Sequence, residues 1–260
     1  MQLSNAHVVL TGASGGIGLA LCDALCKEGA KVLAIARNTQ ALSSLQQKYT
    51  GQIKVLRADL LNFEDLNKVI QTAQQIDGLN LLINAAGVNC FATLDHQTPE
   101  QIQKLVHLNV TAPMSLTAGL ISKLNAGGQA KIVNVGSIYG SLGFAGYTTY
   151  CATKFALRGF SEALRRELAD SNIQVLYVAP RATQTTMNSQ AAMDLMKAMG
   201  SKADSPELVA KVIVQSILQD KQTIYIGWPE RGFVMMNSIM PHVIDQGVRK
   251  HLTLIHQLGH

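Results

Sequence analysis

A tyrosine and a lysine lie four positions apart in the stretch YCATK, residues 150 to 154. On a helix, this spacing brings the two side chains to one face. An ordinary phenol is only about 0.1% ionised at neutral pH, and a nearby ammonium group lowers its pKa by favouring the phenolate. Tyr150 and Lys154 are therefore candidates for acid–base chemistry. The same spacing also occurs on ordinary helix surfaces, so the surrounding elements must decide between the two interpretations.

Short apolar segments alternate with longer segments of helical periodicity along the whole chain. The strand candidates are 7–10, 31–36, 53–57, 79–84, 130–135, 174–178 and 223–227, and the main helix candidates are 18–28, 63–75, 99–124 and 150–171. This alternation predicts an α/β fold, a Rossmann-type, doubly wound parallel sheet of about seven strands with helices on both faces. Nothing resembling a linker or an internal repeat divides the sequence, so we expect one domain over 1–260 with a C-terminal helical extension.

The first strand candidate is followed by the glycine-rich stretch TGASGGIG, residues 11 to 18. In parallel sheets of this kind, ligands bind beyond the carboxyl ends of the strands. Glycines at such a turn let the backbone approach a pyrophosphate, and the following helix start offers free N–H groups. We therefore expect a dinucleotide to contact Gly12, Ser14, Gly16, Ile17 and Gly18. A plain tight turn is the alternative.

The second strand candidate ends in Ala36 and Arg37, where a site for NAD usually carries an acidic residue. A guanidinium group matches the geometry of a 2′-phosphate, so the sequence favours NADP(H) over NAD(H). A solvated surface arginine is the alternative. Asp59 and Leu60 follow the third strand candidate and are expected near the adenine, although Asp59 could instead cap the next helix.

The fourth and fifth strand candidates also end in small or polar residues. LLINAAG carries Asn84, Ala85 and Gly87, and KIVNVGS ends at Ser137. The small residues leave room for a flat ligand, while Asn84 can brace the strand ends. We expect Asn84, Ala85 and Gly87 to contribute to the cofactor site.

Together these motifs resemble those of the short-chain dehydrogenase/reductase family, in its common single-domain branch. The matching stretches are TGASGGIG at 11–18, NAAG at 84–87, Asn109 in HLNV, Ser137 in VNVGS, YCATK at 150–154 and Pro180 in VAP. They follow the order and spacing of the family and cover residues 5 to about 190.

The resemblance implies a catalytic set of four residues. Tyr150 would be the general acid in reduction and the general base in oxidation. Lys154 would supply positive charge and hold the nicotinamide ribose, so both residues also count as cofactor contacts. Ser137 would orient the substrate oxygen, and Asn109 would hold a water that links Lys154 to solvent. Taken one at a time, these residues could equally be a helix cap, a surface residue and a helix-face pair.

One position departs from the family pattern, since Arg181 follows Pro180 where the family usually has glycine. We expect Pro180, Thr183 and Thr185 to contact the cofactor. Arg181 could bind an anionic group of the substrate or cofactor, or lie on the surface.

Residues 186–205 are interpreted as a substrate lid. Their methionines and three apolar residues after Ser137 favour a hydrophobic carbonyl or alcohol as substrate. These residues are Met187, Met193, Met196, Met199, Leu142, Phe144 and Tyr147.

The last segment, 228–260, continues well beyond the last strand candidate and carries an apolar stripe. The stripe comprises Phe233, Val234, Met236, Ile239, Met240, Val243, Ile244 and Val248. A flap over the substrate pocket or a subunit contact is favoured over a membrane-surface contact. His251, His256 and His260 are expected to lie in a solvated tail, and no metal site is expected.

Composition narrows the function classes. The net charge is +5 without a long run of Lys or Arg, which disfavours nucleic-acid binding and suits a phosphorylated ligand. Four cysteines without a zinc pattern suggest reduced thiols in the cytoplasm. The predicted function is an NADP(H)-dependent carbonyl reductase or alcohol dehydrogenase, as a homodimer or homotetramer through the helices at 99–124 and 150–171. A 3-oxoacyl-thioester reductase and a non-catalytic NADP(H) sensor are the alternatives.

Overall fold

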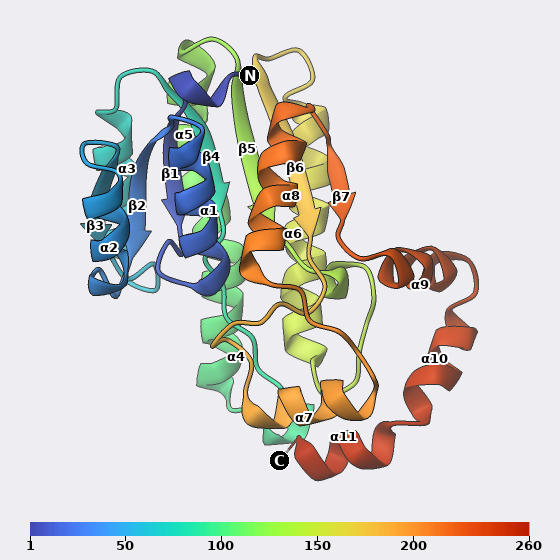
Figure 1. The fold of residues 1–260 in the computed structure, drawn as a ribbon. Helices are drawn as coiled ribbons and strands as arrows, with labels where there is room; N and C mark the ends of the chain where they lie inside the picture. The colour runs from blue at the N-terminus through green and yellow to red at the C-terminus, as the bar shows by residue number, and fades with distance from the viewer. Residues whose placement is uncertain (260) are drawn as a thin grey trace.

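The computed structural model describes residues 1–259 and contains one seven-stranded parallel sheet (Figure 1). The strand order is β3-β2-β1-β4-β5-β6-β7, which confirms the predicted doubly wound fold. The strands are β1 (His7–Thr11), β2 (Lys31–Ala36), β3 (Ile53–Arg57), β4 (Leu79–Asn84), β5 (Ala130–Val135), β6 (Ile173–Ala179) and β7 (Thr223–Tyr225). Strands β2 and β3 lie on one side of β1, and β4 begins the series on the other side. This switch point between β1 and β4 opens a crevice at the carboxyl edge of the sheet.

Helices cover both faces of the sheet. They are α1 (Gly16–Lys27), α2 (Ser43–Lys48), α3 (Phe63–Gln74), α4 (Pro99–Val106), α5 (Ala112–Ala126), α6 (Thr148–Glu167), α7 (Gln190–Ala198), α8 (Pro206–Leu218), α9 (Trp228–Ile239), α10 (Pro241–Arg249) and α11 (Leu252–Leu258). Helices α1 and α8 pack together on one face, whereas α3, α5 and α6 pack on the other. The strands are buried on both sides, which explains their nearly continuous Val, Ile and Leu composition.

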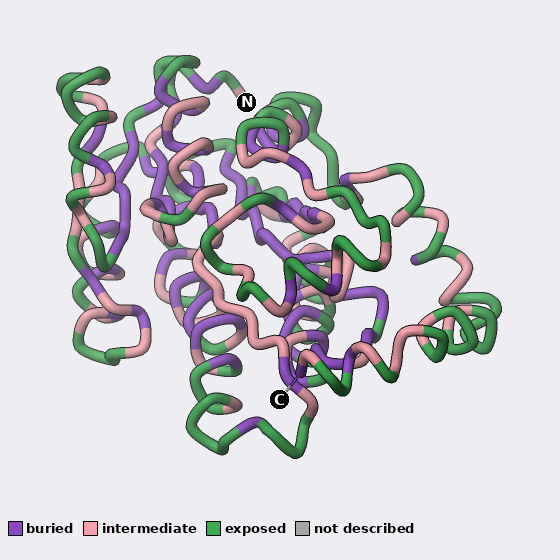
Figure 2. The backbone as a smooth tube through the Cα atoms, turned by 60° about the horizontal axis from the view of Figure 1, so that its bottom comes forward, coloured by how far each residue is buried: buried purple, intermediate pink, exposed green. Residues whose placement is uncertain are grey.

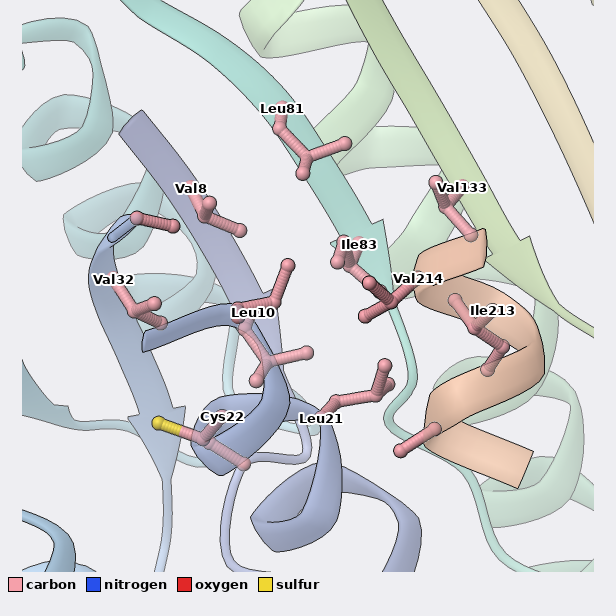
Figure 3. Packing of buried hydrophobic residues seen from close by; sticks show 14 of the residues in the cluster. Val8, Leu10, Leu21, Cys22, Val32, Leu81, Ile83, Val133, Ile213 and Val214 are labelled. Carbon is pink, nitrogen blue, oxygen red and sulfur yellow. The ribbon is translucent and has the colours of Figure 1, made fainter. Parts of the chain in front are cut away.

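The core on the α1 and α8 face shows why the strands are so uniformly apolar. Leu10 of β1 lies beside Leu21 of α1, Val8 lies farther back along β1 in the same cluster, and Val214 of α8 lies close to Ile83 (Figure 3). All five are buried. Burying such side chains contributes about 2 kcal/mol each, so this layer holds the strand ends, and the loops that follow them, in fixed positions.

Helices α4 and α5 form one continuous helix interrupted by a π-helical turn at His107–Thr111. By length and composition alone, Pro99–Ala126 could span a membrane. Its apolar residues Leu116, Leu120 and Leu124 are buried against the sheet, so their composition is accounted for by the core.

The C-terminal extension, residues 228–259, forms three helices that leave the sheet and end beside α7. Helices α9 and α10 stand away from the sheet, and α11 comes back beside α7 (Figure 1). Most of α9 and α10 is exposed or half-buried (Figure 2). At the far end, Ile255 is fully buried near Phe144 and Ala192, and Thr93 N–H donates to the Gly259 carbonyl at 2.9 Å. The extension is thus attached at both ends.

Candidate active site

One large cavity of about 840 Å³ lies at the carboxyl edge of the sheet. The structure places around it almost all of the residues predicted from the sequence to bind a cofactor or substrate. They are Gly12, Ser14, Gly16, Ile17, Gly18, Arg37, Asp59, Leu60, Ala85, Gly87, Ser137, Tyr150, Lys154, Pro180, Thr183 and Thr185. Residues far apart in the chain meet here because parallel strands bring their carboxyl ends to the same edge.

The glycine-rich loop has room for a ligand and none for added side chains. Gly12 has φ +66°, and a Cβ there would lie 2.7 Å from the Ala86 Cα. A Cβ on Gly18 would lie 2.1 Å from the Gly12 carbonyl oxygen. Helix α1 begins at Gly16, and no side chain caps its first N–H groups. These free donors and the positive end of the helix dipole fit the pyrophosphate of a dinucleotide.

Thr11 fixes the loop after β4 next to this cradle. Its hydroxyl accepts hydrogen bonds from the N–H groups of Ala85 and Ala86, both at 3.1 Å. The sequence reasoning did not single out this residue, although a buried threonine at the end of β1 was a possible signal. Thr185 lies against the glycine-rich loop at Gly16, where an added Cβ would lie 2.7 Å from the Thr185 Cγ2. The cradle is therefore bordered by both the β4 and the β6 loops.

Arg37 stands at the end of β2 on the rim of the cavity. It is exposed, and its side chain makes no hydrogen bond or ion pair with any residue that the structure describes. Asp59 lies nearby, but it does not cap α3. Asn62 is the cap, and it accepts from the N–H groups of Glu64 and Asp65. The capping alternative for Asp59 is therefore wrong, and its carboxylate accepts from Leu61 N–H at 3.1 Å instead.

Ser137, Tyr150 and Lys154 converge on the cavity from β5 and α6. Ser137 Oγ accepts from Tyr139 N–H at 3.2 Å, so it also caps a short turn. Lys154 Nζ lies 5.7 Å from the centre of the Tyr150 ring and donates to the Val135 carbonyl at 3.1 Å. The predicted helix-face pair therefore exists, with the ammonium group held beneath the ring by β5.

Burial is the main influence on the acidity of both groups. It raises the pKa of Tyr150 to about 12, and a hydrogen bond with Ser137 lowers it in part. It lowers the pKa of Lys154 from 10.5 to about 8, because the ammonium group is desolvated without a carboxylate partner. The expected lowering of the Tyr150 pKa by Lys154 is therefore wrong for this geometry, in which burial dominates. The further lowering expected from the nicotinamide ring stays a prediction.

Asn109 lies in the π-helical turn and is buried. Its side chain donates to the Val88 carbonyl at 2.9 Å and to Thr153 Oγ1 at 3.0 Å, and accepts from Val88 N–H at 2.9 Å. A Cβ on Gly87 would lie 3.1 Å from Asn109 Oδ1 and 3.6 Å from Lys154 Nζ. Asn109 thus lies behind Gly87, outside the cavity lining. The water that it was predicted to hold stays a prediction.

Asn84 is the other predicted site residue that does not line the cavity. It is buried, and its Nδ2 donates to Asn134 Oδ1 at 2.9 Å and to Thr117 Oγ1 at 3.3 Å. As the last residue of β4, its side chain points to the α5 and α6 face of the sheet. The expectation that Asn84 contributes to the cofactor site is therefore corrected, because its side chain lies outside the cavity lining. Its expected role in bracing the strand ends matches these contacts.

Arg181 lines the cavity, and its guanidinium group is paired with two carboxylates. It makes a bidentate pair with Asp204 at 2.7 and 2.9 Å and a second pair with Glu230 at 3.3 Å. These contacts raise the pKa of Arg181. The residue that replaces the family glycine therefore joins the β6 loop to the end of the lid and to the start of α9.

Much of the cavity lining is apolar. Its walls come from the loop after β5, from the lid and from the C-terminal extension: Leu142, Phe144, Tyr147, Met187, Leu195, Met196, Met199, Phe233, Met236, Val243, Ile244 and Val248. Three of the four lid methionines take part, whereas Met193 is exposed outside the lining. Part of the predicted apolar stripe in the extension thus forms a flap over the cavity. This was one of the three interpretations of the stripe, beside a subunit contact and a membrane-surface contact.

Sequence reasoning missed several residues in the cavity. Tyr139 packs edge-on against Tyr150, with ring centres 6.3 Å apart, and Glu230 lies beside Arg181. The position of Tyr139 two residues after Ser137 was an available signal. His251 also lines the cavity, whereas His256 is exposed and His260 lies outside the described residues. Within 1–259, no three metal-ligating side chains cluster.

Comparisons with known proteins agree with this geometry. The profile of the short chain dehydrogenases matches residues 6–195. Carbonyl reductase family member 4 of Danio rerio is 33% identical, covering 70% of this chain and 77% of its own. Ketoacyl reductase HetN of a Nostoc species is 31% identical, and the match covers 83% of this chain and 76% of HetN. A solved short-chain dehydrogenase from Sphingobium yanoikuyae, in complex with NADPH, is 25% identical with a TM-score of 0.78, covering 92% and 96%.

Proposed function

The chain belongs to the short-chain dehydrogenase family, and from this premise we propose that it is an NADP(H)-dependent reductase or dehydrogenase for apolar ketones and secondary alcohols. Its membership makes it an oxidoreductase acting on CH–OH or C=O groups. The finer statements, the substrate class and the preference for NADP(H), are the proposal. The observation that carries them is one cavity that joins the glycine cradle and the unpaired Arg37 to an apolar lining, with Tyr150, Ser137 and Lys154 at its wall.

The cofactor contacts follow from the residues around the cradle. The loop at 12–18 would hold the pyrophosphate, and Arg37 would pair with the 2′-phosphate because its guanidinium group has no partner among the described residues. Lys154 would hold the ribose next to the nicotinamide. When bound, the nicotinamide supplies the hydride to a carbonyl carbon or accepts it from an alcohol.

The residues of the chain supply the proton and the positioning. Since burial raises the pKa of Tyr150 to about 12, the hydroxyl is protonated at neutral pH and can donate to a carbonyl oxygen. Ser137 offers a second hydrogen bond to the same oxygen. Lys154 places a positive charge beneath the phenol, which stabilises the phenolate left by proton donation.

The apolar chamber favours a bulky or long hydrophobic substituent on the carbonyl. Leu195, Met196 and Phe233 form walls that offer no hydrogen bonds to a sugar, although polar residues of the lid and the extension also line the cavity. Methionine side chains adapt to irregular apolar shapes. A 3-oxoacyl thioester remains the second candidate, favoured by the similarity to the Nostoc ketoacyl reductase.

The test is a panel of ketones and alcohols with NADPH and NADH, measured by absorbance of the reduced cofactor. We expect turnover of hydrophobic ketones, lost in Tyr150→Phe while the dissociation constant for NADPH changes by less than about threefold. Normal turnover by Tyr150→Phe would refute the acid–base assignment. Tight NADPH binding without turnover of any substrate would instead favour a sensor.

Cofactor preference is tested separately with Arg37→Asp. Loss of the phosphate contact should weaken NADPH by about tenfold or more and leave NADH little changed. Lys31→Asp, an exposed change at the other end of β2, is the control for a general charge effect. Equal losses of NADPH and NADH binding in Arg37→Asp would refute the proposed phosphate contact.

A further inference from the structure

The outer face of α9 carries an apolar stripe without a partner in the structure. Trp228, Met235 and Ile239 are spaced so that they fall on one side of the helix. Their side chains are 80%, 59% and 76% exposed. Six of the fourteen large hydrophobic residues that are exposed in the described chain lie between 228 and 243, so this is a concentrated patch and not a scatter of single residues.

The inner face of the same segment lines the cavity. Phe233 and Met236 of α9 and Val243 of α10 belong to the cavity wall, although Phe233 and Val243 are still 48% and 39% exposed. The apolar surface therefore runs from the outside of the extension to its inside without a polar border. Anything bound to the outer face of this segment would therefore also lie next to an entrance of the cavity.

Positive charges flank the stripe. Met235 lines a second pocket together with Lys221 and Arg231, and Arg249 and Lys250 follow at the end of α10. The acidic residues of 228–259 are Glu230, which is paired with Arg181, and Asp245. An amphipathic helix with a tryptophan, apolar side chains and flanking cations is typical of segments that lie in the interface of an anionic membrane.

A second copy of the chain fits the stripe less well. With twelve residues, α9 is about 18 Å long and offers roughly 200 Å² on one face. A stable protein interface buries about 800 Å² on each partner. A lipid surface sets no such minimum, because side chains can insert separately among headgroups.

We propose that α9 and the start of α10 dock onto an anionic lipid surface, with the apolar entrance of the cavity at the membrane. Docking itself does not depend on the proposed function. Only the idea that the membrane delivers an apolar substrate rests on it. The attachment of the extension at both ends would hold the entrance against the lipid surface while the catalytic residues stay in the rigid sheet domain.

The chain provides its own probe, because Trp228 is the single tryptophan in the sequence. Titration of the full chain with vesicles of phosphatidylcholine containing phosphatidylglycerol should shift its emission to shorter wavelength, and the protein should float with the vesicles. Neutral phosphatidylcholine vesicles should bind it more weakly. Met235→Ser/Ile239→Ser should lower the partition coefficient by about tenfold or more, since two exposed apolar side chains are lost.

The matched control is Leu208→Ser/Leu218→Ser, which removes two exposed leucines, 46% and 42% exposed, from α8. It should bind vesicles like the wild type. Absence of an emission shift with either vesicle type would overturn the proposal. So would a shift that appears on raising protein concentration without lipid, accompanied by a dimer in sedimentation that Met235→Ser/Ile239→Ser abolishes. Neither readout requires turnover, so failure here leaves the catalytic proposal intact.

Discussion

Replacing Lys154 by methionine should destroy activity and yet stabilise the protein without cofactor. Lys154 is 5% exposed, its single hydrogen bond in the described structure goes to the Val135 carbonyl, and it has no carboxylate partner. Burial lowers its pKa from 10.5 to about 8. Methionine fills a similar volume without a charge, so it removes the cost of desolvating the ammonium group.

The size of the effect follows from this shift in pKa. A change of two to three units corresponds to about 3 kcal/mol in the free energy of unfolding at neutral pH. Loss of the hydrogen bond to Val135 lowers this gain in the free energy of unfolding by about 1 kcal/mol. We therefore expect Lys154→Met to be more stable by about 2 kcal/mol at pH 7.

The pH dependence of this gain has a defined sign. Between the folded-state pKa of about 8 and the ordinary value of 10.5, the unfolded chain binds more protons at Lys154 than the folded chain does. Wild-type stability therefore rises relative to the variant as pH increases through this window. The advantage of Lys154→Met should be complete below pH 8 and shrink above it.

Urea unfolding followed by circular dichroism between pH 6.5 and 9.5 measures this difference. Lys131→Met is the matched control, since Lys131 is equally buried but forms an ion pair with Asp220. That variant should be destabilised because it removes the ion pair with Asp220, whose remaining cationic partner is the N-terminal ammonium group at 4.0 Å. If Lys154→Met is no more stable than wild type at pH 7, or if its advantage does not change with pH, the reasoning from burial is refuted.

Three further predictions concern the cofactor loop, the extension and the proton donor. Gly18→Ala should weaken NADPH binding by about tenfold or more in fluorescence titration, because its Cβ would lie 2.1 Å from a backbone oxygen. Arg181→Gly should raise KM for an apolar ketone and leave the Kd for NADPH nearly unchanged, because the pairs with Asp204 and Glu230 hold the lid and the extension; a change confined to NADPH would contradict this. Alcohol oxidation should accelerate with pH between 6 and 9 while ketone reduction does not, because burial raises the pKa of Tyr150 to about 12; a pH-independent oxidation rate would argue against it as the base.

The sheet could be predicted from the sequence because its strands are short, apolar and followed by turn residues. The segments 31–36, 53–57, 79–84 and 130–135 match the observed strands residue for residue. Strand β6 extends one residue beyond each end of its predicted segment, and β7 is two residues shorter than predicted. Periodicity fixes the existence of such elements better than their ends.

The position of individual side chains was harder to predict. Asn84 and Asn109 belong to the recognised motifs, yet both lie behind the cavity wall, since the direction of a side chain at a strand end or in a π turn does not follow from spacing. The ion-pair partners of Arg181 are Asp204 and Glu230, which lie 23 and 49 positions further along the chain. Such long-range pairing leaves no local pattern.

The π-helical turn at His107–Thr111 makes the protein sensitive to a kind of change that composition does not reveal. Deleting one residue there would let ordinary α-helical pairing continue and would rotate the preceding helix by about 100° relative to the following one. Helix content and hydropathy would hardly change. The amide behind Gly87 would nevertheless be turned away from its backbone partners, so a one-residue gap in an otherwise well-aligned relative would mark a rearrangement beside Lys154 and not a neutral trimming of a helix.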